Sequence, residues 1–178
     1  MERDQRGPLR YYLDFLIPPV AAVAVALGDA ARWSASWVAL AVFGLVLFTF
    51  LEYWTHRVIL HRIMWHSTHQ RHHAHPSEYV VFPWWYLPGI FLAFWVVLPA
   101  PVFSGFMAGA TWFYVWHHAI HHWDLAGHPW VQEYERWHEM HHADLPVNYG
   151  ITHPGWDLVF GTYMSPTRVD VKKSQKWA

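Results

Sequence analysis

Two stretches of apolar sequence each run directly into an array of histidines, and this pattern limits how the chain can fold. Residues 112–122 read WFYVWHHAIHH, and residues 137–142 then read WHEMHH. An earlier array follows the apolar run of residues 37–54, with histidines at positions 56, 61, 69, 72 and 73. Imidazole is costly to bury at a membrane boundary without a polar partner. The fold must therefore bring these histidines to a partner that they share.

The composition is typical of a membrane protein. Hydrophobic residues make up 54% of the 178 residues and charged residues only 14%, whereas soluble domains carry about 25% charged residues. The net charge of −1 gives no basic field, so we expect no nucleic-acid partner. The chain has no Cys, which excludes disulfides, thiolate metal sites and a cysteine nucleophile. Any metal must therefore be held by nitrogen or oxygen ligands.

Four apolar segments are expected to form transmembrane helices in two hairpins, since a span needs about 20 apolar residues. The segments are residues 11–27, 37–60, 83–103 and 104–123. Pro18-Pro19 and Pro88-Gly89 interrupt the first and third segments, which could therefore cross incompletely. The expected fold class is all-α and integral to the membrane, with a cytoplasmic helical cap that holds the histidines. Residues 1–178 are expected to form a single domain.

The distribution of Lys and Arg predicts the orientation, because cytoplasmic segments carry an excess of these residues. With a cytoplasmic N-terminus, Arg32 alone lies outside. The residues that then lie inside are Arg3, Arg6, Arg10, Arg57, Arg62, Arg71, Arg136, Arg168, Lys172, Lys173 and Lys176. This multi-pass topology places both termini and both histidine arrays on the cytoplasmic side, where the arrays can share one site.

The spacing of the histidines favours ligation of a metal. Two triplets have the spacing i, i+3, i+4, which places their side chains on one face of a helix, so each triplet can present several imidazoles toward one place. The triplets are His69, His72 and His73, and His138, His141 and His142. His117 and His121 are four apart and also share a face.

His56 and His61 do not have a spacing that places two side chains on one face of an α-helix. They are five residues apart, which is about 140° around an ideal helix. They point the same way only if the helix ends or widens between them. Otherwise they serve different metals.

An ordinary surface histidine, or a buffering cluster, is the plainer interpretation of any single position. Neither explains repeated same-face spacing on four segments on one side of a membrane. Ten candidate ligands exceed the four of a closed zinc site and suit two metals with five or six ligands each. The predicted metal ligands are His56, His61, His69, His72, His73, His117, His121, His138, His141 and His142.

Three further residues are candidates for a supporting role at this site. Glu52 lies four residues before His56 on the same helix face and could orient its imidazole. His122 adjoins His121, and Asp157 is a weaker candidate for the same kind of role.

These residues resemble the fatty acid hydroxylase (sterol desaturase) superfamily. Residues 56–61, HRVILH, resemble its His-Arg-x-x-x-His motif, and residues 69–73, HQRHH, resemble its His-x-x-His-His motif. Residues 117–122 resemble its His-x-x-x-His-His motif, and residues 138–142 its last His-x-x-His-His motif. The ending WDLVFGT at 156–162 is similar as well, so the match runs from Glu52 to Thr162. The nearest pattern is that of fatty acid 2-hydroxylases and their short bacterial relatives.

The resemblance implies oxidation of a lipid C–H bond by O₂ at two iron ions, held by the ten histidines above. Imidazole ligation does not select between iron and zinc, so purified protein could carry zinc. The resemblance also implies a lipid substrate and a separate electron donor, a ferredoxin or a cytochrome b5-type protein with its reductase. A carotenoid- or sterol-type hydroxylase, a desaturase and a non-redox metal-binding membrane protein stay open as alternatives.

Overall fold

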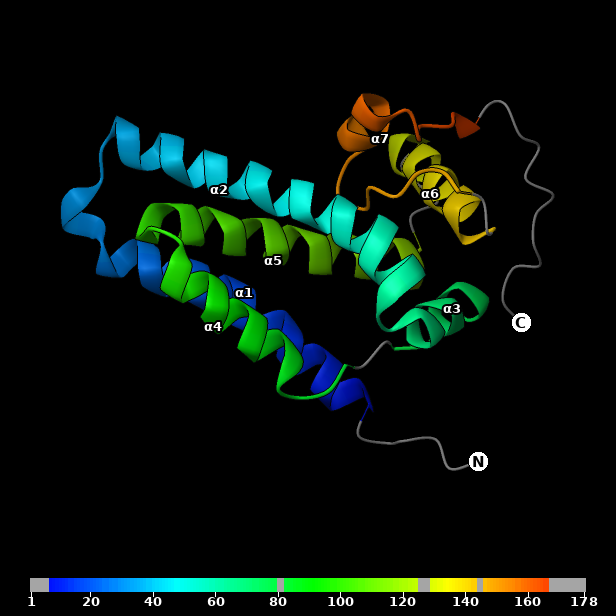
Figure 1. Cartoon of the computed structure of the whole chain (residues 1–178), viewed down its shortest axis with the longest axis horizontal. Helices are drawn as coiled ribbons and strands as arrows, with labels where there is room; N and C mark the ends of the chain where they lie inside the picture. The colour runs from blue at the N-terminus through cyan, green and yellow to red at the C-terminus, as the bar shows by residue number, and fades with distance from the viewer. Residues whose placement is uncertain (1–6, 80–81, 125–128, 144–145, 167–178) are drawn as a thin grey trace.

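The computed structural model describes residues 7–79, 82–124, 129–143 and 146–166, and its regular elements there are all helices (Figure 1). The predicted all-α fold is therefore confirmed. The α-helices are α1 (Gly7–Gly28), α2 (Ala35–Trp54), α3 (His66–Ala74), α4 (Tyr86–Val97), α5 (Ala100–His122), α6 (Pro129–His142) and α7 (Gly155–Phe160). A 3₁₀ turn, η1 (Ala30–Arg32), joins α1 to α2, and a π-helix, η2 (Thr55–Ile63), continues α2.

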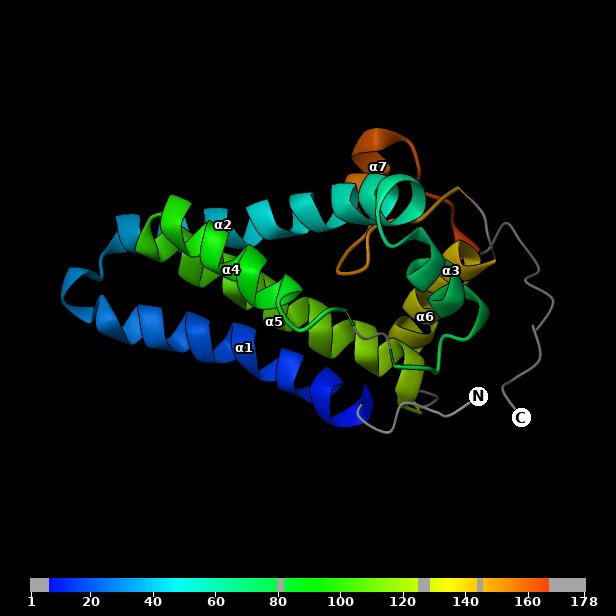
Figure 2. The ribbon, with the colours of Figure 1, turned by 60° about the horizontal axis from the view of Figure 1, so that its bottom comes forward.

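Four helices form a long body, and the shorter helices gather at one of its ends. Helices α1, α2, α4 and α5 run side by side, and α3, α6 and α7 lie together at the end where α2 and α5 finish (Figures 1 and 2). Helix α1 leads away from this end and α2 returns to it; α4 leads away and α5 returns. The two apolar runs that precede the histidine arrays therefore finish at the same place.

Helices α2 and α5 touch backbone to backbone, which fixes their crossing. A Cβ atom added at Gly44 would lie 1.9 Å from the carbonyl oxygen of Val102. A Cβ atom added at Gly105 would lie 1.7 Å from the carbonyl oxygen of Ala41. Only glycine fits at either position, because any side chain would separate the helices. This close contact sets the position of α5, and with it that of its C-terminal histidines.

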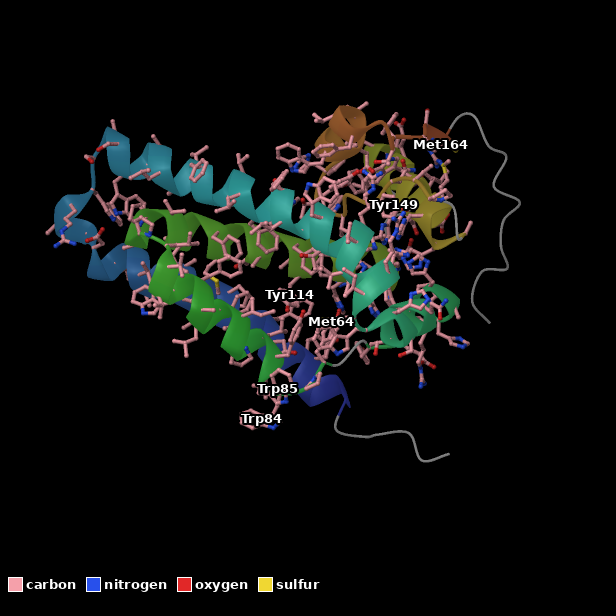
Figure 3. The ribbon with its side chains drawn as sticks, viewed as in Figure 1. Met64, Trp84, Trp85, Tyr114, Tyr149 and Met164 are labelled. Carbon is pink, nitrogen blue, oxygen red and sulfur yellow. The ribbon has the colours of Figure 1, made fainter. Side chains whose placement is uncertain are left out.

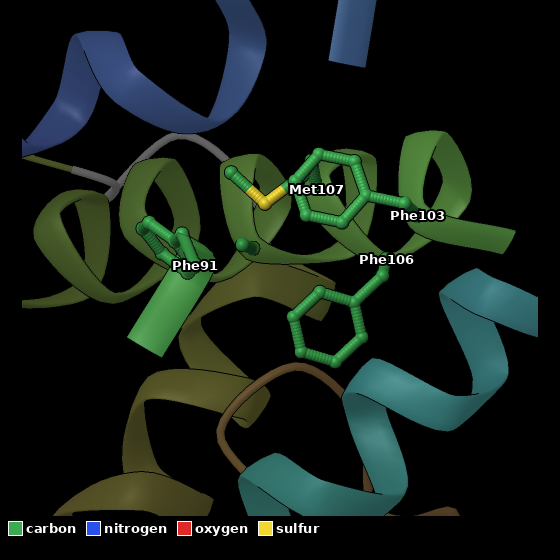
Figure 4. Packing of buried hydrophobic residues seen from close by; sticks show 5 residues of the cluster. Phe91, Phe103, Phe106 and Met107 are labelled. Atoms are coloured by element: carbon green, nitrogen blue, oxygen red, sulfur yellow. The ribbon is translucent and has the colours of Figure 1, made fainter. Parts of the chain in front are cut away.

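A compact apolar cluster locks α4 against α5. Its buried members are Phe91, Phe103, Phe106, Met107 and Ala110 (Figure 4). Phe106 packs edge-on against Phe48 of α2, with ring centroids 5.2 Å apart. Burial of side chains this large contributes about 1.5–3 kcal/mol each. Because residues of α1 also pack on it, the cluster holds together all four helices of the long body.

Two stretches, Tyr11–Gly28 and Ala35–Ile63, are long and apolar enough to cross a membrane. Helix α1 is continuous through Pro18 and Pro19, because neighbouring residues such as Ile17 and Ala21 pack on the apolar cluster and hold it. The expected break at these prolines is therefore not found.

The expected third span at 83–103 is divided between two helices. Helix α4 has only 12 residues, which is about 18 Å of helix against a hydrocarbon thickness of about 30 Å. Pro99 precedes α5 and Pro101 lies in its first turn, where proline is well tolerated, so these prolines begin α5. The four-span topology stays a prediction. Arg3, Arg6, Arg168, Lys172, Lys173 and Lys176, on which the orientation partly depends, lie outside the described residues.

Candidate metal centre

The π-helix places His56 and His61 on one face. Met64 donates its backbone N–H to the carbonyl oxygen of Ile59, five residues earlier, over 2.8 Å. This i→i+5 pattern widens the turn, so that residues five apart come to lie above one another. The ring centroids of His56 and His61 are 5.2 Å apart. The sequence left open whether the helix ends or widens between these histidines or whether they serve different metals. In the structure the helix widens.

Five histidines from η2, α3 and α6 converge as the first cluster. Its members are His56, His61, His69, His73 and His141, whose ligand nitrogens lie within 4.8 Å of one another. The Nε2 atom of His69 is central, at 3.0 Å from the Nε2 atoms of both His56 and His61. His73 reaches the same atom over 3.0 Å. All five side chains are buried or half-buried.

Five more histidines, from α3, α5 and α6, converge as the second cluster. Its members are His72, His117, His121, His138 and His142, again with ligand nitrogens within 4.8 Å of one another. The Nε2 atom of His121 lies 3.1 Å from the Nε2 atoms of both His117 and His138. His72 approaches the Nε2 atom of His117 to 3.2 Å.

Each histidine triplet is divided between the two clusters: two of its members point to one cluster and the third points to the other. Helix α3 gives its i, i+4 pair to the first cluster and its middle residue, His72, to the second. Helix α6 does the reverse and gives only His141 to the first. Positions i+3 and i+4 diverge by about 100° around a helix. Two helices packed between the clusters therefore serve both of them.

The nitrogen–nitrogen distances fit a bound metal in each cluster. Ligands about 2.1 Å from an ion and at right angles to one another lie about 3.0 Å apart, whereas tetrahedral ligands lie about 3.4 Å apart. The distances of 3.0–3.2 Å fit the first arrangement. One pair of imidazole nitrogens at this distance can share a hydrogen bond, but the single Nε2 atom of His69 faces the Nε2 atoms of His56, His61 and His73 at 3.0 Å and cannot pair with all three, whereas one bound cation would satisfy them together. An all-imidazole donor set suits iron, zinc, copper or nickel.

Burial keeps these imidazoles neutral, which is the form that binds metal. Burial, followed by the influence of neighbouring His73, lowers the pKa of His72 to about 3 and that of His141 to about 3. Burial and adjacent imidazoles also lower the pKa of His138 and of His142. At neutral pH these side chains therefore offer lone pairs without first losing a proton.

Backbone carbonyls orient two ligands of the first cluster. His56 donates through Nδ1 to the carbonyl oxygen of Tyr149, a residue at the end of the molecule that holds the shorter helices (Figure 3). His141 donates through Nδ1 to the carbonyl oxygen of Val147 over 2.9 Å. A proton held on Nδ1 leaves Nε2 as the free lone pair aimed into the cluster. Sequence analysis missed both partners, because a backbone carbonyl has no side-chain signature.

Two buried carboxylates hold the loop that carries Tyr149. Asp157 accepts hydrogen bonds from the backbone N–H groups of Tyr149 and Gly150, each over 2.8 Å. Glu52 accepts one from the backbone N–H of Ile151 over 2.7 Å. Burial raises the pKa of Asp157, and its hydrogen bonds partly offset this rise. The two side chains therefore act on His56 through the loop.

The remaining supporting candidate lies away from the metal ligands. His122 stacks on Tyr79, with ring centroids 5.1 Å apart, and on His118, at 4.4 Å. It belongs to neither cluster. Helix α5 thus directs His117 and His121 toward the clusters and the neighbouring pair His118 and His122 toward α1 and the loop after α3.

A cavity of about 470 Å³ joins both clusters to the apolar interior. Its wall includes apolar residues such as Phe94, Phe106 and Ala110. The same wall includes histidines of both clusters, His56 and His69 from the first and His72 and His117 from the second. Its surface is mostly apolar. The cavity can therefore hold a chain-like apolar molecule with one portion beside the histidines.

Comparison with known proteins agrees with this arrangement. The profile of the family named Fatty acid hydroxylase matches residues 41–162, which is well over half of the chain and includes all ten clustered histidines. The chain belongs to the fatty acid hydroxylase family. The resemblance inferred from the histidine motifs is thereby confirmed, and metal binding, membrane association and lipid metabolism are the properties that fit this family.

Curated relatives are similar to this chain over most of its sequence. Dihydroceramide fatty acyl 2-hydroxylase FAH1 of Arabidopsis thaliana is 31% identical over 157 residues, which cover 78% of this chain and 65% of that protein. Ceramide very long chain fatty acid hydroxylase scs7 of Schizosaccharomyces pombe is 31% identical over 147 residues, which cover 68% of this chain and 41% of that protein. The chain thus spans less than two thirds of the length of these relatives.

A solved structure shares the fold. It is described as full-length scs7p with only the hydroxylase domain visible, and it matches with a TM-score of 0.72 over 92% of this chain and 71% of that one. The sequences are 23% identical.

Proposed function

We propose that this protein hydroxylates the acyl chain of a lipid with O₂ at a centre of two iron ions, each held by one histidine cluster. The observation that carries the proposal is the continuity of one apolar cavity with both clusters. A site for a small polar substrate would not need a wall of phenylalanines. The names of the relatives, which are fatty acyl hydroxylases, support the same substrate class.

The two iron ions, when bound, supply the redox chemistry in which O₂ and two electrons convert a C–H bond to C–OH and release water. The ten histidines hold the ions, with His56 and His141 oriented by loop carbonyls. The apolar wall holds one carbon of the chain beside the histidines and excludes bulk water. Reduction of the second oxygen atom of O₂ to water needs two electrons and two protons that the lipid C–H bond does not supply. They come from outside the protein and the lipid.

The membrane arrangement and the partners belong to the same proposal. Helices α1 and α2 cross the bilayer, with η2 leaving it at the cytoplasmic side, and the α4–α5 hairpin completes the bundle. The apolar side chains that α1 and α2 expose, such as Leu16 and Val46, support contact with lipid. Residues 1–178 act as one domain, and a ferredoxin or a cytochrome b5-type donor with its reductase delivers electrons at the cytoplasmic end. Zinc can replace iron during purification, because the donor set does not distinguish them.

Mass spectrometry of cellular lipids under ¹⁸O₂ tests the reaction. Cells that express the protein should accumulate an acyl lipid with one ¹⁸O-labelled hydroxyl. A variant with His121→Ala and His141→Ala, one substitution in each cluster, should form none. His75→Ala, at an exposed histidine of the same end of the molecule, should form the wild-type amount.

Each other outcome contradicts a named part of the proposal. An unlabelled lipid with a new double bond would identify a desaturase. Label appearing equally with the double variant would show that the clusters do not perform the oxidation. Absence of any labelled product, with iron bound and a reductase supplied, would favour a non-redox metal protein.

A further inference from the structure

Five tryptophan and tyrosine rings on α5 and α6 are connected by direct ring contacts. The ring centroid of Trp137 lies 4.9 Å from that of Tyr134, and Tyr134 lies 5.2 Å from Trp116. Trp116 then stacks on Trp130 at 6.1 Å and on Trp112 at 5.3 Å, with interplanar angles of 5° and 13°. All four distances lie in the range of aromatic rings in contact. The five residues therefore form one continuous aromatic path.

The inner end of the aromatic path adjoins the second histidine cluster at two points. Trp116 directly precedes His117, and Trp137 directly precedes His138. Both histidines belong to the second cluster, and the Nε2 atom of His121 lies 3.1 Å from the Nε2 atom of each. Two members of the path are therefore one residue away from side chains proposed to hold a metal ion.

The outer end of the aromatic path reaches the surface without entering the cavity. Trp137 is only 3% exposed, whereas Trp112 is 49% exposed and Trp130 is 66% exposed. None of the five residues of the path is among those that line the cavity. The path therefore leads from the second cluster to solvent by a route separate from the space proposed for the lipid.

The reaction proposed for the clusters creates a need for such a route. Hydroxylation draws on four electrons, two from the external donor and two from the lipid C–H bond. When no lipid occupies the cavity, the second pair has to come from another source, and the histidines next to O₂ are exposed to oxidation. Indole and phenol rings lose an electron much more readily than the benzene ring of phenylalanine. A connected series of tryptophan and tyrosine can therefore give these electrons in place of the histidines.

We propose that the aromatic path carries electrons from a soluble thiol to the clusters when O₂ reacts without a lipid, and so protects the histidines from oxidation. Each electron that leaves Trp116 or Trp137 is replaced, ring by ring, through Trp130 or Trp112. Two thiols at the surface each give one electron and one proton, and they form a disulfide. With two electrons and two protons from the donor, O₂ then becomes two molecules of water. The inference rests on the proposed function, since it needs O₂ to react at the clusters.

Peptide mass spectrometry of the purified iron-loaded protein tests the path. The protein receives O₂ and a reductase system, without lipid and without thiol, and its oxidised residues are mapped. Trp130 and Trp112 should gain oxygen, because they are the outermost rings and no thiol reduces them. Adding thiol, or adding the acyl lipid, should suppress this modification. Trp33 is an internal control, since it is 54% exposed but follows η1, at the end of the long body away from the histidines, and it should stay unmodified.

A pair of variants at the centre of the path separates electron transfer from packing. Trp116→Phe keeps an aromatic ring that is hard to oxidise, and it should lower the modification of Trp130 and Trp112 several-fold while oxidised histidine in the second cluster increases. Trp116→Tyr has nearly the same size as Trp116→Phe but can be oxidised, and it should restore part of the modification. Trp33→Phe is the matched control and should leave the pattern unchanged. Metal content and the initial rate of lipid hydroxylation should be equal in all of these proteins.

Each contrary outcome is assigned to one of the two proposals. Equal modification of Trp33 and Trp130 would show that the oxidant diffuses through solution, and it would overturn the path. Identical patterns in Trp116→Phe and Trp116→Tyr, or wild-type modification of Trp130 in Trp116→Phe, would overturn it as well. So would the absence of modified Trp130 in a wild-type protein that hydroxylates lipid. Failure of the wild-type protein to hydroxylate any acyl lipid would contradict the proposed function instead.

Discussion

His56 and His61 face the same cluster although five residues separate them, with ring centroids 5.2 Å apart. The cause is the π-helix at Thr55–Ile63, whose i→i+5 hydrogen bonds widen the turn. π-Helical turns are concentrated at functional sites, where they aim particular side chains. Here the widened turn lets one continuous helix supply two ligands to the same cluster.

Changing the spacing of this pair should change metal binding. Inserting one Ala after Val58 separates the two histidines by six residues, which is on different faces of an α-helix, and should remove the metal of the first cluster. Deleting Ile59 leaves the two histidines four residues apart, on one face of a regular α-helix. This variant should retain more metal than the insertion variant. Iron and zinc content per chain is measured for both variants. Equal metal loss in the two would contradict the account of the π-helix.

Substituting one member of a cluster should affect mainly the ion of that cluster. His61→Ala and His117→Ala, one in each cluster, should each lower the metal content from about two ions per chain toward one. His118→Ala changes the neighbour of His117, outside both clusters, and is the matched control that should keep both ions. Metal analysis after gel filtration makes the comparison. Full retention of both ions in His61→Ala and His117→Ala would contradict the assignment of ligands.

Asp157 should matter for the first cluster without touching it. Asp157→Asn places an NH₂ group against the N–H groups of the Tyr149 loop, and an unsatisfied buried donor costs about 1–3 kcal/mol. We expect a lower unfolding temperature and weaker retention of the first ion. Thr162→Val removes only one of the hydrogen bonds to Asp157 and should have a smaller effect. Unchanged metal retention in Asp157→Asn would show that the loop does not orient His56.

The close crossing of α2 and α5 should not tolerate a methyl group. Gly105→Ala brings Cβ into the carbonyl of Ala41, and we expect the free energy of unfolding to fall by at least about 2 kcal/mol. Gly89→Ala is the control, because a Cβ atom there meets nothing within 4 Å and alanine favours the helix by up to about 1 kcal/mol. Thermal unfolding in detergent compares the two. Similar stability of both variants would contradict the backbone-to-backbone contact.

Removal of metal should loosen the histidine end and spare the helical body. Helices α3 and α6 are held by the clusters, whereas α2, α4 and α5 are held by apolar packing and glycine contacts. After chelation we expect faster hydrogen exchange in α3 and α6, with unchanged exchange in α5 near Met107. Mass-spectrometric hydrogen exchange with and without chelator measures this. Uniform loss of protection would show that the metal supports the entire fold.

The sequence alone predicted the helical fold, the ten clustered histidines and the family. These follow from local regularities: apolar runs predict helices, and i, i+4 spacing predicts shared faces. The expectations that needed correction were those about how helices end and pack. Pro18 and Pro19 lie within α1 because tertiary packing holds it, and α4 is shorter than its apolar sequence. The division of each triplet between two clusters was also missed.

Which histidine joins which cluster was decided only by the tertiary structure. Helices α3 and α6 lie between the two clusters, and that placement depends on helix crossings set by contacts such as Gly105 against Ala41, far away in sequence. The hydrogen bond between His56 and the carbonyl of Tyr149 likewise joins residues 93 positions apart. Spacing along a helix fixes direction relative to its own axis. Only packing fixes where that axis lies, and therefore which atoms meet.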